Sequence, residues 1–207
     1  MTFVDMIQSE TAYNLGVDFV RILHLAAMAV ALGSIAATHT STLKSLSNPL
    51  DRAKIGQLEM IHHMVKAALA VLWLSGIGLI GIRTGFQLEN FSPKLWTKVA
   101  VVAMLTITAF AIQVRVLPLL NASIGRSIRD LELGTKLRLA FFVGLSAAGW
   151  GSAMMLGAVR IFKPMPWTDL IAIFGGLHFT AVVGLMLAAW VLHRIRFAPA
   201  RPNLAAA

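Results

Sequence analysis

Histidine is the residue type in this chain that could do chemistry. A histidine inside lipid is energetically costly, so its presence there indicates a functional site. Four of the six histidines form two pairs with the same spacing. His24 and His39 are fifteen residues apart in the first strongly apolar segment, and His178 and His193 are fifteen apart in the last. On a helix this separation is about 22 Å, most of the hydrocarbon thickness of a bilayer. Two parallel helices with this spacing could hold two haems, one near each membrane face.

A further histidine cluster lies near the start of the second apolar segment, where residues 60–64 read Met-Ile-His-His-Met. Consecutive helical residues point about 100° apart, so His62 and His63 cannot both face one partner. Either one could replace His39 or His193 as a ligand of an inner haem. Imidazole and thioether sulfur also favour copper, so the cluster is a candidate copper site as well. A polar cap that faces the lipid headgroups is the structural alternative.

The composition indicates a membrane protein. Hydrophobic residues make up 57% of the chain and charged residues 13%, with a mean hydropathy of +0.76. An average soluble domain carries about 25% charged residues. We expect no cleaved secretion signal, because the first ten residues are acidic rather than basic. Cysteine is absent, which excludes disulfides, iron–sulfur clusters and thiolate-bound zinc. The net charge of +9 is typical of loops beside membrane spans, so we expect no nucleic-acid partner.

Five apolar segments are long enough to cross a bilayer, which predicts an all-α integral membrane protein, a bundle of five transmembrane helices. We expect these helices at residues 17–40, 58–82, 95–117, 136–160 and 168–193. Helix-breaking residues separate them: Asn48-Pro49, Gly85 with Ser92-Pro93, Pro118 at the end of the third helix, and Pro164 with Pro166. The sequence predicts a single transmembrane domain, 1–197, and a flexible C-terminal tail, 198–207.

Lysine and arginine predict how the bundle is oriented. Six of them lie beside the N-terminus and the second and fourth connections: Arg21, Arg83, Lys94, Lys98, Arg160 and Lys163. The other twelve lie on the opposite side: Lys44, Arg52, Lys54, Lys66, Arg115, Arg126, Arg129, Lys136, Arg138, Arg194, Arg196 and Arg201. Because cytoplasmic loops carry the excess of positive charge, we expect the N-terminus outside and the C-terminus in the cytoplasm.

This orientation makes the first and fifth helices run in the same direction, so the depths of their histidines can be compared. His24 is expected about 10 Å below the outer face, and His178 at a similar depth. His39 and His193 both fall near the cytoplasmic boundary. We therefore expect His24 and His178 to bind an outer haem. The His39–His193 pair, or a histidine of the 60–64 cluster in its place, is expected to bind an inner haem or metal.

Three cations lie near the expected outer site. Arg21 precedes His24 by three residues and shares its face, Lys98 is one turn inside the third helix, and Arg83 ends the second. These cations could pair with haem propionates or with an anionic substrate. Two alternatives stay open: Arg83 and Lys98 could extend to the headgroups, and Arg21 could pair with Asp18.

Small residues recur at every fourth position in the last two spans, and such stripes let helix backbones approach closely in lipid. We therefore expect two stripes at helix–helix contacts: Gly144, Ala148 and Ser152, and Gly176, Thr180, Gly184 and Ala188.

Three segments have the look of a known group of proteins: FVRILHLAAMAVALGS, SPKLWTKVAVVAML and LSAAGWGSAMMLGAVR. An apolar first helix with a histidine, followed by a lysine early in the third helix, resembles the small haem-binding membrane proteins. These include the HemJ-type protoporphyrinogen oxidase and the membrane domain of copper-resistance protein D. The resemblance covers residues 17–117 and implies a haem-ligand role for His24 and a functional role for Lys98. The later helices match neither family, and the His178 and His193 pair looks more like dihaem cytochrome b.

Together these features predict a multi-pass protein of the bacterial inner membrane, similar to cytochrome b. It would bind one or two haem b groups and pass electrons across the membrane, with a quinone or a redox partner protein as the other reactant. A copper or small-solute transport protein is the first alternative. The second is a non-catalytic accessory subunit of a membrane complex, in which the histidines are structural.

Overall fold

The computed structural model describes the backbone of residues 3–196 and the side chains of residues 10–195. Within these residues the chain is all-helical, and five helices are long and apolar enough to cross a membrane. They begin and end as follows: α1 Phe3–Ser45, α2 Arg52–Thr84, α3 Pro93–Ala111 with its continuation to Asn121, α5 Leu133–Ala158 and α6 Trp167–Arg196. The prediction of an all-helical chain with five helices able to cross a membrane is confirmed. The predicted tail, 198–207, lies outside the described residues.

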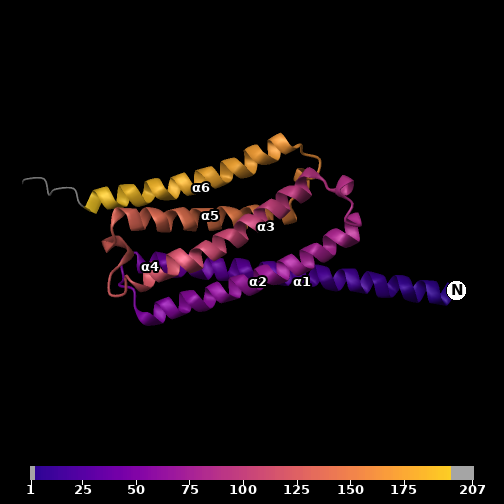
Figure 1. Ribbon diagram of the computed structural model, residues 1–207, viewed down its shortest axis with the longest axis horizontal. Coiled ribbons are helices and arrows are strands. Elements are labelled where there is room, and N and C mark those ends of the chain that lie inside the picture. The colour runs from indigo at the N-terminus through magenta and orange to yellow at the C-terminus, as the bar shows by residue number, and fades with distance from the viewer. Residues whose placement is uncertain (1–2, 197–207) are drawn as a thin grey trace, which may run out of the picture.

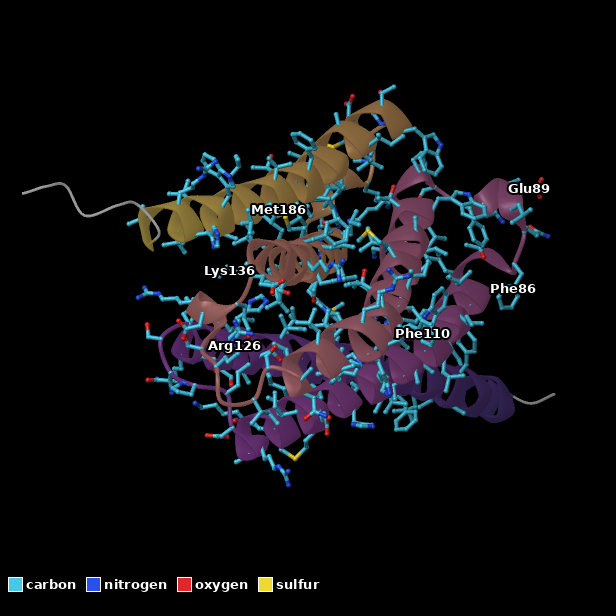
Figure 2. All side chains as sticks on the ribbon, turned by 60° about the vertical axis from the view of Figure 1, so that its left-hand side comes forward. Phe86, Glu89, Phe110, Arg126, Lys136 and Met186 are labelled. Atoms are coloured by element: carbon cyan, nitrogen blue, oxygen red, sulfur yellow. The ribbon has the colours of Figure 1, made fainter. Side chains whose placement is uncertain are left out.

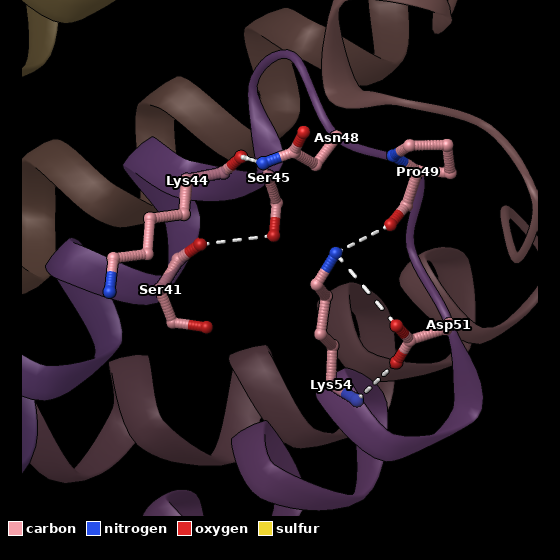
Figure 3. Close-up of polar contacts among 7 residues, drawn as sticks. All are labelled: Ser41, Lys44, Ser45, Asn48, Pro49, Asp51 and Lys54. Carbon is pink, nitrogen blue, oxygen red and sulfur yellow. Dashed lines mark hydrogen bonds and ion pairs between the residues drawn. The ribbon is translucent and has the colours of Figure 1, made fainter.

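A polar turn joins α1 to α2 (Figure 3). Asp51 caps the start of α2, since its carboxylate accepts a hydrogen bond of 2.7 Å from the backbone amide of Lys54. The ammonium of Lys54 donates to the carbonyl of Pro49 at 2.7 Å. Asn48 donates its side-chain amide to the carbonyl of Lys44, in the last turn of α1. Exposed helix-end groups are therefore satisfied locally, as Asn48-Pro49 predicted for this break.

The second break, between α2 and α3, also follows the sequence. Gly85 ends α2 in the left-handed conformation, with φ of 60°, and its amide bonds to the carbonyl of Gly81. A short 3₁₀ turn, Leu88–Asn90, follows. Ser92 then caps α3, and Pro93 occupies the first helical position, where its missing amide hydrogen costs nothing.

The prediction that Pro118 ends the third helix is wrong. The helix passes from α3 into a π turn, Ile112–Val116, and continues as α4 (Leu117–Asn121) with Pro118 inside it. A π turn contains one residue more than a regular helical turn. It therefore interrupts the regular hydrogen-bond pattern of the α-helix. The wider turn lets the helix continue past a residue that has no amide hydrogen to donate.

The long helices are arranged as two antiparallel pairs with α3 between them (Figure 1). α1 packs along α2, and α5 packs along α6, while α3 contacts both α5 and α2. The main core joins residues from all five long helices, among them Ala31, Leu72, Leu105, Leu156 and Phe174. α1 and α6 thus lie on opposite sides of α3, each held by its own partner.

The bundle has two ends that differ in their connections. The N-terminal end of the bundle carries the start of α1, the 85–92 connection and the short turn Arg160–Phe162 before α6. The C-terminal end carries the 46–51 connection, the 122–132 connection with its turn Ile128–Asp130, and the end of α6. Figure 2 shows Phe86 and Glu89 at the first end and Arg126 and Lys136 at the second.

Only one of the two small-residue stripes packs inside the chain. Gly144, Ala148 and Ser152 of α5 are buried, and a methyl group added at Gly144 would lie 2.9 Å from the Cα atom of Val182 on α6. The α6 stripe is exposed, and no described atom lies within 4 Å of a methyl group added at Gly176 or Gly184. The expectation for α6 is wrong within this chain, because α6 turns Ala181 and Val182 toward α5 instead.

We predict that Gly144→Ala destabilises the protein by about 1–3 kcal/mol, because the new methyl group meets backbone rather than a movable side chain. Thermal unfolding in detergent measures the change. Gly151→Ala, in the same helix, is the matched control, since open space surrounds its added methyl group. The control should be neutral or slightly stabilising. Equal losses for the two variants would contradict the close α5–α6 contact.

Candidate functional site

A cavity of about 380 Å³ lies at the C-terminal end of the bundle. All five long helices line it, and its wall is mostly apolar, with residues such as Leu58, Leu105, Val143 and Leu185. The connections close its end, because the amide of Leu50 bonds to the carbonyl of Arg126 and the amide of Gly125 bonds to the carbonyl of Leu50. A concave, mostly apolar space with a few polar groups has the character of a small-molecule site.

His62 is the polar group of the cavity wall that most needs a partner. It comes from the first half of α2, it is only 8% exposed, and its Nε2 atom is buried without any hydrogen bond. A buried polar atom without a partner costs about 1–3 kcal/mol, so such atoms are rare unless a ligand or water meets them. His62 is therefore the histidine of this wall whose Nε2 lacks a hydrogen-bond partner among the described residues.

His39 lines the same cavity from α1 and is half-buried. Several hydroxyl groups of the wall donate to backbone carbonyls one turn earlier in their own helix: Thr38 to Ser34, Thr42 to Thr38, Ser45 to Ser41 and Thr108 to Met104. These hydroxyls are satisfied locally. The two imidazoles are thus the wall groups with the chemistry to hold a metal or haem iron. They come from adjacent helices, since α1 packs along α2.

Two cations complete the wall of the cavity. Lys136, in the first turn of α5, is buried, and Arg129, in the turn before α5, is exposed. The ammonium of Lys136 lies 3.2 Å from Nδ1 of His193. An ammonium can only donate, so Nδ1 of His193 accepts and the proton of a neutral imidazole sits on Nε2. His193 therefore orients Lys136 rather than offering its own Nδ1 to a ligand.

His24 occupies a different place, at the contact of α1 with α2. Its Nδ1 lies 2.8 Å from Oγ of Ser75, whose hydroxyl donates to the carbonyl of Val71 at 2.6 Å. Because the serine has already given its only proton, Nδ1 of His24 is the donor, and Nε2 carries the lone pair. Lys98 of α3 lies within electrostatic range of His24.

His178 has a similar tautomer on the other side of the bundle. Its Nδ1 donates to the carbonyl of Phe174 at 2.6 Å, and its Nε2 is buried with no partner. His178 belongs to α6, which packs on α5, whereas His24 belongs to α1, which packs on α2. The two histidines that we expected to share an outer haem are therefore on helices that do not pack against each other.

His63 is exposed and donates Nδ1 to the carbonyl of Glu59 at 2.8 Å. His62 is buried, so the prediction that these neighbours cannot face one partner is confirmed. Met60 and Met64 are exposed as well, 60% and 46% respectively. Among the residues with described side chains, no group of three or more His, Asp or Glu residues lies close enough to hold a metal ion.

The cations of the expected outer site separate into two kinds. Arg21 pairs with Asp18 at 2.9 Å, and both side chains are exposed, which is the alternative left open by the sequence. Arg83 is exposed, whereas Lys98 is half-buried. Lys98 is therefore the least exposed cation of this group.

Sequence reasoning missed Lys136, which it counted only as a loop charge. The available signal was that Lys136 is a charged residue at the start of the mostly apolar fourth span. The direction in which the Lys136 side chain points depends on which helices are neighbours. A count of charges gives no information on helix neighbours.

Comparison of the chain with protein-family models, curated proteins and solved structures found no match. Its function is therefore argued from the geometry of these sites.

We predict that His62→Leu leaves the thermal stability of haem- and metal-free protein unchanged or raises it, because the substitution removes a buried polar atom that has no partner. His24→Leu is the contrasting variant, since it removes the hydrogen bond that Ser75 accepts from His24 and should cost about 1 kcal/mol. Unfolding midpoints in detergent give both values. A larger loss for His62→Leu than for His24→Leu would mean that His62 has a stabilising partner.

Proposed function

We propose that this protein is a multi-pass haem protein of the bacterial inner membrane, similar to cytochrome b, with a haem b in the cavity at the C-terminal end. The observation that carries the proposal is that His62, whose buried Nε2 has no hydrogen-bond partner, belongs to the wall of a mostly apolar cavity. Imidazole nitrogen is a usual axial ligand of haem iron. His62 is accordingly the first candidate ligand, and His39 the second.

The rest of the cavity suits the other parts of a haem. Its apolar wall would cover the flat face of the macrocycle and exclude water. Haem b carries two propionates, and Lys136 and Arg129 are two cations of the same wall that could pair with them. A bound haem would supply one-electron chemistry, while the residues of this chain would hold, orient and shield it. A quinone or a redox partner protein would be the other reactant.

The tautomers of His24 and His178 support both residues as candidate ligands of a second haem. In both residues Nδ1 is the donor, which leaves Nε2 available, and this is the form that metal-binding histidines adopt.

The charge distribution supports an outside N-terminus. Twelve of the eighteen lysines and arginines belong to the side of the C-terminal end, which would face the cytoplasm. The proposed haem would then lie toward the cytoplasmic leaflet.

We predict that protein purified in detergent shows a Soret band that shifts on reduction, and a pyridine haemochrome typical of haem b. His62→Ala should weaken haem binding at least about tenfold, because it removes an axial ligand. His63→Ala is the matched control and should keep the spectrum, since His63 is exposed and points elsewhere.

Other outcomes of the same experiment would support the alternatives. No Soret band in protein expressed with sufficient haem would overturn the haem proposal. Stoichiometric copper without haem, lost when His62 and His63 are both replaced, would support copper binding or transport. Tolerance of every histidine substitution, with co-purification of a larger complex, would support an accessory subunit.

A further inference from the structure

Four cations gather at the N-terminal end of the bundle, away from the cavity. Lys94 and Lys98 are one helical turn apart at the start of α3, Arg83 is in the last turn of α2, and Lys163 directly follows the turn Arg160–Phe162. They come from the end of α2, the start of α3 and the connection before α6. Like charges this close repel one another unless an anion lies between them. This set, Arg83, Lys94, Lys98 and Lys163, is called the basic cluster below.

No described carboxylate neutralises the basic cluster. The ion pairs of the described side chains are Arg21 with Asp18 and Lys54 with Asp51, and neither involves a cluster member. Glu89 is in the adjacent 85–92 connection, where it is exposed and forms no ion pair (Figure 2). An excess of positive charge therefore remains at this end.

Lys94 is held in place rather than free to move away. Its ammonium donates to the carbonyl of Val159, at the end of α5, at 2.6 Å. An ammonium has three hydrogens, so two remain for another acceptor. Lys98 is one turn further along α3 and half-buried, so it cannot simply extend into water. The backbone amides in the first turn of α3 add partial positive charge at the same point.

Aromatic residues occur in the same segments of the chain as the basic cluster, between Arg83 and Lys98. Phe91 and Trp96 stack with ring centroids 5.1 Å apart, and Trp96 is 38% exposed. Phe86 is 60% exposed and adopts φ of 59°, a strained left-handed conformation for a residue with a side chain. Its ring lies over Gly81, where any side chain would collide with it. Exposed aromatic rings beside cations are typical of the headgroup level of a membrane.

We infer that Arg83, Lys94 and Lys98 bind the phosphate group of an anionic ligand at the N-terminal end of the bundle. Convergent cations are groups that recognise phosphate. In a membrane the phosphate belongs to an anionic lipid headgroup, whose chains would lie along the exposed apolar surface of α3. A free phosphate could supply the same group from solution. The inference does not depend on haem in the cavity at the other end.

The test measures binding of phosphatidylglycerol to the purified full chain by native mass spectrometry, with phosphatidylcholine as the lipid of no net charge. Lys94→Gln with Lys98→Gln should weaken phosphatidylglycerol binding at least about thirtyfold, since each cation near an anionic lipid contributes roughly a factor of five. The matched control is Lys44→Gln with Arg52→Gln, which removes two exposed cations at the C-terminal end. It should weaken binding no more than about fivefold.

The remaining arms separate the outcomes. Inorganic phosphate that binds the wild type, and not the Lys94 and Lys98 variant, would identify a soluble phosphate as a ligand. Phosphatidylglycerol binding that inorganic phosphate does not displace would identify a lipid. Equal losses for the two double variants would overturn the site. His62→Ala should retain phosphatidylglycerol binding, so that failure of the haem proposal and failure of this inference give different results.

Discussion

The contact of Leu105 with Gly149 determines how the rest of the bundle is arranged. A methyl group added at Gly149 of α5 would lie 2.6 Å from a methyl carbon of Leu105 on α3, so the leucine side chain would have to shift to admit it. The contact fixes α3 against α5 and thereby between the α1–α2 and α5–α6 pairs. Leu105 and Trp150, beside this contact, also line the cavity. The close approach that separates α1 from α6 thus also shapes one wall of the candidate site.

Hydrogen-bond satisfaction explains why so few groups are available for chemistry. A membrane interior offers no water, so serine and threonine hydroxyls bond to carbonyls of their own helices. Ser75 is an exception, because its hydroxyl donates to the carbonyl of Val71 and also accepts a hydrogen bond from His24. This second bond orients the imidazole ring of His24. What remains unpartnered among the described buried side chains is a short set: His62 Nε2, His178 Nε2 and Ser152 Oγ. Two of these three atoms are histidine nitrogens.

The sequence predicted where residues lie along the bundle axis better than it predicted which helices are neighbours. Apolar runs, Gly85 and Ser92-Pro93 located the helices, and the 100° step separated His62 from His63. The fifteen-residue spacing of His24 and His39 likewise fixed their relative depth. It contained no information on which helices touch, because that depends on contacts such as Gly144 with Val182. The continuation of the third helix past Pro118 was missed for a related reason, since a π turn has no sequence signature of its own.

The ring nitrogen that carries the proton distinguishes the histidines from one another more clearly than their depth along the bundle does. An imidazole that donates through Nδ1 keeps Nε2 for a metal, and His24, His63 and His178 are of this kind. His193 is of the opposite kind, because an ammonium holds its Nδ1 lone pair. Of the first group, His63 faces outward and the other two lie away from the cavity. His62 therefore stands out because burial, a free nitrogen and a cavity coincide at one residue, and depth alone would have ranked it with its exposed neighbour.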